Sequence, residues 1–335
     1  METTRSPWWQ DAVVYQVYLR SFADADGDGV GDLVGLISRL DHLGSLGVDA
    51  LWLNPCYRSP QADHGYDIAN YFEIDPAYGT VQDVDTLVAE AGRRGIRVIM
   101  DMVANHCSSD HEWFRAALAA APWSAERARF HFRDGRGPGG DEPPNNWLSV
   151  FGGPAWTRVR EADGALGQWY LHSFDASQPD FNWANPEVAA YFDDVLRFWF
   201  ARGIAGFRVD VAHGMVKAEG LPDTPEPDGD EPAHNYGMWD QPGVHDIYRR
   251  WRHIGDSVDG EPRYFVGEIW VPEVDGIRAY IRPDEMHQAF SFDLLVQPWN
   301  GARQREAIDR ALAMVGSGSV PAWTLSNHDV HRTVT

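Results

Sequence analysis

Short runs of β-branched and aliphatic residues alternate with amphipathic stretches along this chain, and this alternation constrains the fold more than any other feature. It is typical of strand–helix units whose strands join one parallel sheet. Seven strands are expected, at Val13–Leu19, Ala50–Leu53, Arg97–Val103, Ile204–Val209, Tyr264–Glu268, Ala289–Leu295 and Ala322–Ser326. The apolar periodicity predicts helices at Leu33–Leu43, Val81–Gly95, Pro186–Gly203, His245–Ile254 and Ala302–Val315.

Two polar segments interrupt the alternation. Residues 107–175 are irregular and rich in Gly, Pro and Trp, and residues 213–240 form a second, Pro-rich insertion. The first is too long for a plain loop, so it is either functional or an inserted subdomain. We therefore predict an α/β fold, a TIM-type (β/α)8 barrel formed by residues 1–106 and 176–335, with 107–175 as an inserted domain after the third strand. The alternation stops after seven strands, so the barrel is expected to be incomplete and cut before an eighth.

Charge and composition limit the classes of molecule that this chain is expected to bind. The 28 basic and 50 acidic residues give a formal charge of −22, which repels phosphate backbones and argues against nucleic acid. We find no apolar run long enough to span a membrane and no signal-peptide pattern at the start, METTRSPWWQ. The two cysteines, Cys56 and Cys107, are expected to be free thiols in a reducing cytoplasm.

Two strand ends carry the residues that bear most directly on chemistry. In GFRVD, Arg208 and Asp210 point to the same side of a strand, and the cation keeps the carboxylate ionised, as a nucleophile requires. A purely structural ion pair would give the same pattern. In VGEIW, Glu268 ends a strand beside Trp270, and the aromatic setting is expected to raise the pKa of this carboxyl, as suits a general acid.

Three further strand ends are polar. They offer Asp101, Asn105 and His106 in DMVANH, His328 and Asp329 in LSNHD, and Tyr66 and Asp67 in DHGYD. Each group taken alone is compatible with capping residues or satisfied core histidines. Together they place a carboxylate at five strand ends of one rim, where barrel active sites lie. Paired carboxylates flanking a bond are what glycoside hydrolysis needs.

Several of these motifs occur together and in order. DMVANH, GFRVDVAH, VGEIW and LSNHD resemble the four ordered sequence regions of the α-amylase superfamily. QPDFNW resembles the fifth region as found in the oligo-1,6-glucosidase and α-glucosidase branch, and the segments WWQDAVVYQVYLRSF and HGYDIANY are similar to that branch too. The resemblance extends over essentially the whole chain.

The resemblance implies a retaining α-glucosidase acting on a small oligosaccharide or disaccharide. It implies that Asp210 is the nucleophile, Glu268 the acid/base and Asp329 the third catalytic carboxylate. The residues that it implies around the glucose are Asp67, His106, Arg208 and His328, with Tyr66 beneath the ring. Retention requires the Asp210 and Glu268 carboxyls to lie about 5–5.5 Å apart. The family's eighth strand, the arginine that follows it and the C-terminal β-domain are not found in this sequence.

A second candidate site lies in DADGDGVGD. Asp24, Asp26 and Asp28 have the spacing of the first ligands of a Ca²⁺ loop, but Gly35 stands where an EF-hand needs Glu. A turn rich in Asp and Gly with no ion is the alternative. The same branch of the superfamily has a Ca²⁺ loop after its first strand, and the resemblance implies a structural Ca²⁺ held by Asp24, Asp26, Asp28, the Val30 carbonyl and Asp32.

The sequence cues for the substrate conflict. Val211, after the nucleophile, resembles enzymes that prefer α-1,6 bonds, whereas Ala212-His213 and Met238–Trp251 resemble α-glucosidases acting on maltose and short oligosaccharides. We favour short α-1,4-linked substrates. A transglucosylase such as trehalose synthase or a sucrose isomerase is the alternative, because a glucosyl intermediate can meet a sugar instead of water. The superfamily's inactive transporter subunits carry a membrane span and lack the three carboxylates, so we set that reading aside.

Overall fold

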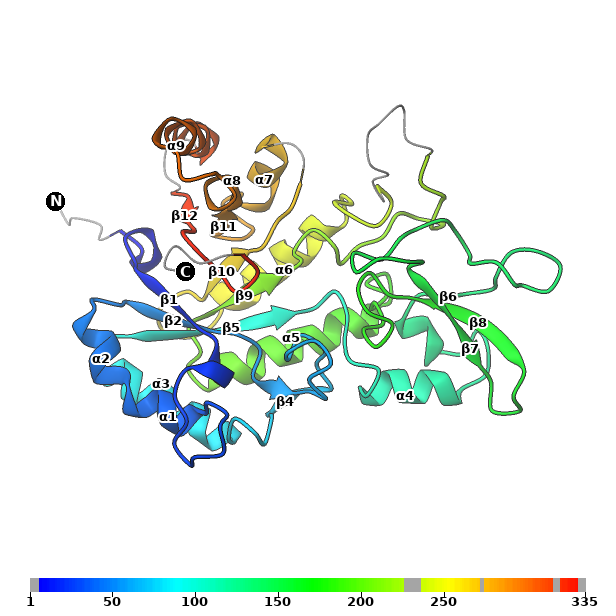
Figure 1. The fold of residues 1–335 in the computed structure, drawn as a ribbon, viewed down its shortest axis with the longest axis horizontal. Coiled ribbons are helices and arrows are strands. Elements are labelled where there is room, and N and C mark those ends of the chain that lie inside the picture. The colour runs from blue at the N-terminus through cyan, green and yellow to red at the C-terminus, as the bar shows by residue number, and fades with distance from the viewer. Residues whose placement is uncertain (1–5, 226–235, 272–273, 316–319, 331–335) are drawn as a thin grey trace.

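A seven-stranded parallel sheet organises the chain, as expected. The computed structural model describes residues 6–225, 236–271, 274–315 and 320–330. Neighbouring strands are parallel throughout the sheet, and β1 and β12 stand at its two ends (Figure 1). In sheet order the strands are β1 (Val14–Val17), β2 (Ala50–Leu53), β5 (Arg97–Val103), β9 (Gly206–Asp210), β10 (Tyr264–Gly267), β11 (Gln288–Ser291) and β12 (Ala322–Trp323). This curled sheet confirms the predicted TIM-type fold class.

Helices join successive strands and cover the outer face of the sheet. In α5, Asn185 caps the first turn, Pro186 occupies its start, and an apolar stripe that includes Phe192 and Trp199 is buried. A capping box between Thr80 and Asp83 starts α3. The remaining ranges are α1 (Leu33–Ser38), α2 (Leu40–Ser45), α3 (Val81–Arg93), α5 (Pro186–Ala201), α6 (Val244–Asp256), α7 (Val274–Tyr280), α8 (Phe292–Leu295) and α9 (Gly301–Val315).

Two expected elements differ in the structure. The helix predicted at Leu33–Leu43 is interrupted at Arg39, whose backbone (φ −102°, ψ 1°) leaves the helical region and separates α1 from α2. The strand predicted at Ala289–Leu295 ends at Ser291, and α8 follows at once. A short apolar run fits a strand and a buried helical turn equally well, so periodicity alone could not separate the two.

The inserted segment between β5 and α5 contains a small antiparallel sheet of its own. Its strands are β6 (Phe132–Arg133), β7 (Trp156–Arg160) and β8 (Leu166–Leu171), in the order β6-β8-β7, and helix α4 (Glu112–Ala119) precedes them. This unit projects to one side of the barrel (Figure 1). A β-bridge between Phe130 and Phe181 joins it to the segment that leads into α5. The boundaries at residues 107 and 175 stay a prediction. No described helix is long and apolar enough to cross a membrane.

The largest core cluster fills the space between the sheet and its helices. A separate small cluster contains Trp52, Ile99 and Tyr264, with Trp8 and Trp9 packed against it. These side chains come from β2, β5 and β10, and the N-terminal turn η1 (Trp8–Gln10) closes over them. Because barrel strands converge on a packed interior, side chains at their carboxyl ends are held in fixed positions.

Candidate active site

A pocket of about 870 Å³ lies at the carboxyl ends of the strands. Asp210, Glu268 and Asp329 all line it, as do Tyr66, His106, Arg208 and His328. Asp67 is the exception among the predicted residues, since it is fully buried and does not line the pocket. Its carboxylate accepts hydrogen bonds from the Ser59 hydroxyl and from the backbone of Ala62 and Asp63, so it fixes the loop before Tyr66. Substrate contact by Asp67 stays a prediction.

The Arg208 guanidinium contacts three carboxylates at the centre of this pocket. Nη1 donates to Asp101 Oδ1 at 2.8 Å and to Asp210 Oδ1, and Nη2 lies 2.8 Å from Glu268 Oε2. The register of the sheet explains this geometry, because Asp101 of β5 pairs with Arg208 of β9. Asp210 and Glu268 are therefore neighbours on one cation. Their shared contact with Arg208 is compatible with the predicted spacing of about 5–5.5 Å between the two carboxyls, and that spacing stays a prediction.

Burial and charge act in opposite directions on these carboxyls. Burial raises the pKa of Asp101 and raises that of Asp210 well above its ordinary value, although Arg208 opposes both shifts. Burial also acts to raise the pKa of Glu268, but Arg208 and the Val211 amide outweigh it and the pKa lies below its usual range. Three carboxylates share one cation, so we infer that the cluster retains a proton.

The expected effect of Trp270 on Glu268 was wrong. The sequence predicted that this aromatic neighbour would raise the pKa of the carboxyl. In the structure the indole Nε1 donates a hydrogen bond to Glu268 Oε1 at 3.2 Å, and this bond contributes to lowering the pKa. The sequence argument counted the ring as apolar surface and missed its polar N–H group.

Val211 has a strained backbone immediately after Asp210. Its φ of 42° lies in the left-handed region, which is costly for a β-branched residue. In this conformation the Val211 N–H donates to Glu268 Oε2 at 3.1 Å, and the next amide, of Ala212, donates to the Glu268 carbonyl at 2.9 Å. The strained turn thus holds the acid/base candidate beside the nucleophile candidate.

The other predicted residues surround this centre. His328 stacks on Tyr66 with ring centroids 5.5 Å apart, and the Tyr66 hydroxyl lies 2.9 Å from its Nε2. Burial lowers the pKa of His328 and of His106. Asp329 has 54% of its side chain exposed, with Oδ1 3.5 Å from His328 Nε2. Sequence reasoning missed Gln16 of β1, which contacts His328 Nδ1 at 2.9 Å.

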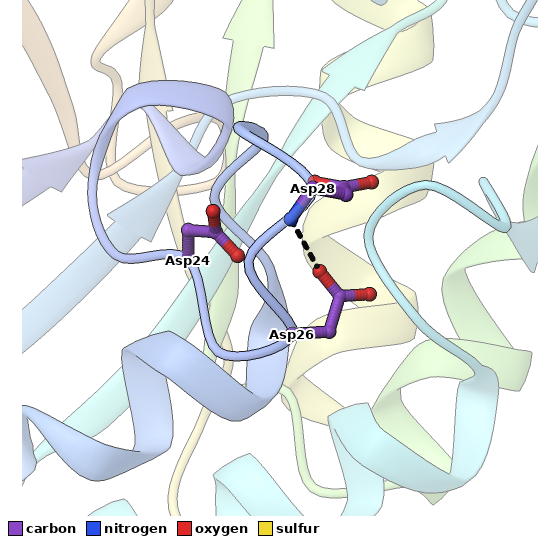
Figure 2. A group of neighbouring side chains, drawn as sticks. All are labelled: Asp24, Asp26 and Asp28. Atoms are coloured by element: carbon purple, nitrogen blue, oxygen red, sulfur yellow. Dashed lines mark hydrogen bonds between the residues drawn. The ribbon is translucent and has the colours of Figure 1, made fainter.

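The acidic loop after the first strand has the geometry of a cation site. Asp24, Asp26 and Asp28 each place a carboxylate oxygen within 4.8 Å of the others (Figure 2). The backbone amides of Gly29 and Gly27 lower the pKa of Asp24, which favours the ionised form that a ligand needs. Asp32 lies outside this group and instead accepts hydrogen bonds from Gly35 and Ala25. Carboxylate oxygens are ligands of the kind that Ca²⁺ takes, but the ion and all five predicted ligands stay predictions.

The family model for the α-amylase catalytic domain matches residues 16–335. The chain belongs to the α-amylase family. It is 40% identical to trehalose-6-phosphate hydrolase of Bacillus subtilis over 349 residues, which covers all of this chain and 60% of that protein. It is 38% identical to oligo-1,6-glucosidase IMA5 of Saccharomyces cerevisiae, covering 98% and 59%.

A solved structure extends the comparison. The α-glucosyl transfer enzyme XgtA aligns with a TM-score of 0.89 and 38% identity, over 98% of this chain and 62% of that one. This α-amylase-family chain thus spans about 60% of the length of the curated relatives it matches. Its homologues include proteins named trehalose-6-phosphate hydrolase and oligo-1,6-glucosidase, which supports the enzyme class predicted from the sequence.

Sequence reasoning also missed Lys217, the single lysine among the 28 basic residues of this α-amylase-family chain. Its buried ammonium lies 2.8 Å from Asp180 Oδ2 and 3.0 Å from Asn105 Oδ1, and it also bonds to the Ser173 hydroxyl and the Gly214 carbonyl. It therefore ties the loop after β9 to the base of the inserted unit. The sequence could have marked this position, because Lys217 is a lone lysine in a chain whose other 27 basic residues are arginines.

Proposed function

We propose that this chain carries the catalytic centre of a retaining α-glucosidase. The substrate is the non-reducing terminal α-glucosidic bond of maltose or of short (iso)malto-oligosaccharides. The observation that carries the proposal is the contact of one buried guanidinium, that of Arg208, with both Asp210 and Glu268. Two carboxyls held so close favour attack by one of them on the sugar, because an inverting pair must leave room for water between them.

Each residue then has a defined part in two steps. An Asp210 carboxylate oxygen attacks the anomeric carbon, while the Glu268 carboxyl gives its proton to the glycosidic oxygen and the bond to the leaving sugar breaks. Glu268, now ionised, takes a proton from water, which attacks the glucosyl ester and releases Asp210. In the free pocket the order of the two pKa values is the opposite, raised for Asp210 and lowered for Glu268, so a proton must move from Asp210 to Glu268 before Asp210 attacks. Asp329 is proposed to bind sugar hydroxyls at the open side.

The charge of the pocket supports an uncharged substrate. Among the described residues that line it, the acidic side chains include Asp63 and Asp329. The arginine in this lining is Arg208, whose guanidinium already contacts three carboxylates. No cation among these lining residues is left to bind a phosphate group. This favours plain glucosides over the phosphorylated disaccharide named in the Bacillus subtilis relative.

A transglucosylase such as trehalose synthase or a sucrose isomerase is the second candidate. The similarity to an α-glucosyl transfer enzyme favours it, as does the apolar pocket mouth, where Phe151 is 60% exposed. Product analysis separates the candidates. Hydrolysis of maltose or sucrose releases free glucose, whereas transfer yields a rearranged disaccharide or longer products.

The direct test is hydrolysis of maltose, isomaltose and p-nitrophenyl α-glucoside by the purified protein. Asp210→Asn should lower kcat by at least about a thousandfold, since the covalent step is lost. Asp194→Asn is the matched control, because Asp194 is 72% exposed on α5, and it should leave activity unchanged. Full activity in Asp210→Asn would overturn the nucleophile assignment.

Two further properties are proposed. We propose that the loop holding Asp24, Asp26 and Asp28 binds Ca²⁺, supported by the convergence of three carboxylates, and that the ion stabilises the fold without taking part in the reaction.

We propose a cytoplasmic location. Cys56 and Cys107 support it, because they are buried free thiols of a kind that persists in a reducing compartment.

A further inference from the structure

A second cavity, of about 970 Å³, lies between the barrel and the inserted unit. Its walls are the antiparallel pair β3 (Tyr57–Arg58) and β4 (Asn70–Ile74), the start of α4, and Tyr191 of α5. Strand β4 packs against α5, and α4 of the inserted unit lies beyond it (Figure 1). The described residues that line this outer cavity include none of those that line the active pocket.

The charges of the outer cavity do not favour an anion. Both arginines in the described lining are already paired. Arg58 Nη1 lies 3.1 Å from Glu73 Oε2, and Arg115 Nη2 lies 2.8 Å from Asp110 Oδ1. The same lining carries four carboxylates against these two guanidinium groups. A phosphate group would have to displace a carboxylate from an arginine, so a phosphorylated ligand is disfavoured.

The carboxylates of the outer cavity are not arranged for a metal ion either. Asp75 is buried, and its carboxylate accepts hydrogen bonds from the backbone N–H groups of Ser59 at 3.1 Å and Ala77 at 3.0 Å. Among the described residues, the acidic side chains that converge closely enough for an ion belong to the loop after β1. A carboxylate held by amides or by arginine keeps unused lone pairs, so it can accept hydrogen bonds from the hydroxyl groups of an uncharged ligand.

Tyr191 supplies a hydrogen-bond donor to the outer cavity. His111 caps α4, and its Nδ1 accepts the Trp113 N–H at 3.2 Å. Burial lowers the pKa of His111 to about 4, so at pH 7 the ring is neutral and its proton is on Nε2. This Nε2 donates to the Tyr191 hydroxyl oxygen at 3.1 Å. Since no described residue accepts the Tyr191 hydroxyl proton, that proton is available to a ligand.

Aromatic rings provide the apolar part of the lining. Phe72 and Tyr191 both line the outer cavity, with ring centroids 5.6 Å apart and planes at 82°. The lining therefore combines flat apolar surfaces with carboxylate acceptors and with a hydroxyl donor. Ligand pockets of this size bind small molecules through apolar walls and a few oriented polar groups. This combination suits a ring that carries many hydroxyl groups.

We propose that the outer cavity is a second, non-catalytic binding site for an uncharged polyhydroxylated ring, such as a glucose unit of maltose. The carboxylates accept hydrogen bonds from the sugar hydroxyls, the Tyr191 hydroxyl donates one, and an apolar face of the sugar packs on Phe72. The site does not depend on the proposed reaction, because the described residues that form it are separate from those of the active pocket.

Equilibrium dialysis with radiolabelled maltose tests this site. Asp210→Asn is the background, because it is expected to stop turnover and leave both cavities in place. We expect it to bind two maltose molecules per chain. Adding Ala69→Trp fills the outer cavity with an indole, and the number should fall to one. Adding Ala302→Trp instead, at an exposed position on α9, is the matched control and should leave two.

A smaller change tests the donor. Tyr191→Phe keeps the ring and removes the hydroxyl, so in the Asp210→Asn background it should weaken binding of maltose at the outer cavity about fivefold. Inorganic phosphate, used as a second probe, should show no binding that Ala69→Trp removes. This variant still tests the site if Ala69→Trp does not fold, because phenylalanine adds no atoms to the cavity.

The outcomes separate this site from the proposed function. A maltose count that Ala69→Trp leaves unchanged, or an affinity that Tyr191→Phe leaves unchanged, would overturn the outer site. Phosphate binding that disappears with Ala69→Trp would overturn its preference for an uncharged ligand. If the active pocket binds no maltose, Asp210→Asn should hold one molecule per chain and the Ala69→Trp variant none; that result counts against the proposed function and supports the outer site.

Discussion

Arg208 illustrates how a catalytic centre departs from what stability alone would select. Its buried guanidinium contacts the carboxylates of Asp101, Asp210 and Glu268. A single buried ion pair barely compensates for the loss of hydration, and three anions around one cation leave net negative charge in a region of low polarity. The stability of the rest of the barrel holds these groups together. The excess negative charge favours binding of a proton by the carboxylates, and substrate binding can move that proton from one carboxylate to another.

The stability of Asp210→Asn should reveal this charge. Burial raises the pKa of Asp210 well above its ordinary value, so the folded protein binds this proton more tightly than the unfolded chain. The ionised carboxylate therefore destabilises the fold above its folded-state pKa, and the penalty disappears as pH falls towards the unfolded value near 4. We expect Asp210→Asn to gain about 1 kcal/mol in free energy of unfolding at pH 8 and little at pH 4.

Urea unfolding of both proteins at the two pH values measures this difference. Asp194→Asn, at the exposed position on α5, should show no gain at either pH. A gain that is equal at pH 8 and pH 4 would mean that the buried charge of Asp210 is not its source.

At the residue scale, the sequence predicted which side chains meet but not all of their contacts. Strand periodicity and the barrel fold place Asp210, Glu268 and His328 on one rim, and the structure brings them together there. The Val211 amide and the Trp270 N–H were not predictable, because both depend on backbone and ring orientation in the turns that follow the strands. The sequence also could not show that Asp67 lies outside the pocket lining, because its position depends on the path of the loop before Tyr66.

At the scale of elements, the seven strands were predictable because each is a short apolar run between turn signals. The break between α1 and α2 at Arg39 and the short helix α8 were not, since their residues keep an apolar pattern that fits either structure. Where elements join, buried polar contacts decide the geometry. Lys217 is the clearest case, because it lies after β9 and contacts Asp180 at the base of the inserted unit.

Lys217→Met should destabilise the protein strongly. Burial lowers the pKa of Lys217, and its attraction to Asp180 opposes that shift; both side chains are at most 1% exposed. Removing the ammonium leaves the Asp180 carboxylate buried without its cation. We expect a loss of about 3–5 kcal/mol in the free energy of unfolding, measured by urea titration.

The double variant Lys217→Met/Asp180→Asn is the informative comparison. It removes both charges, so we expect it to recover part of the stability lost in Lys217→Met. If the double variant is as unstable as the sum of its two single variants, the pair is not coupled and the role assigned to Lys217 is wrong.

For the whole molecule, the acidic excess and the loop after β1 bear on the same question of cation binding. The formal charge is −22, and Asp24, Asp26 and Asp28 gather three carboxylates on the exposed loop between β1 and α1. Repulsion among these carboxylates is relieved by a bound divalent cation. An ion that binds the folded chain and not the unfolded one stabilises the fold in proportion to the logarithm of its concentration.

Added Ca²⁺ should therefore raise the melting temperature of the purified protein, and a chelator should lower it. At a concentration about one hundred times the dissociation constant, the gain is about 2.7 kcal/mol, which is readily seen by calorimetry. Asp26→Asn should abolish the response because it removes one of the three converging carboxylates (Figure 2). Asp49→Asn, in an acidic residue outside this group, should leave the response intact. A melting temperature that does not move with Ca²⁺ or chelator would show that Asp24, Asp26 and Asp28 form an acidic turn without an ion.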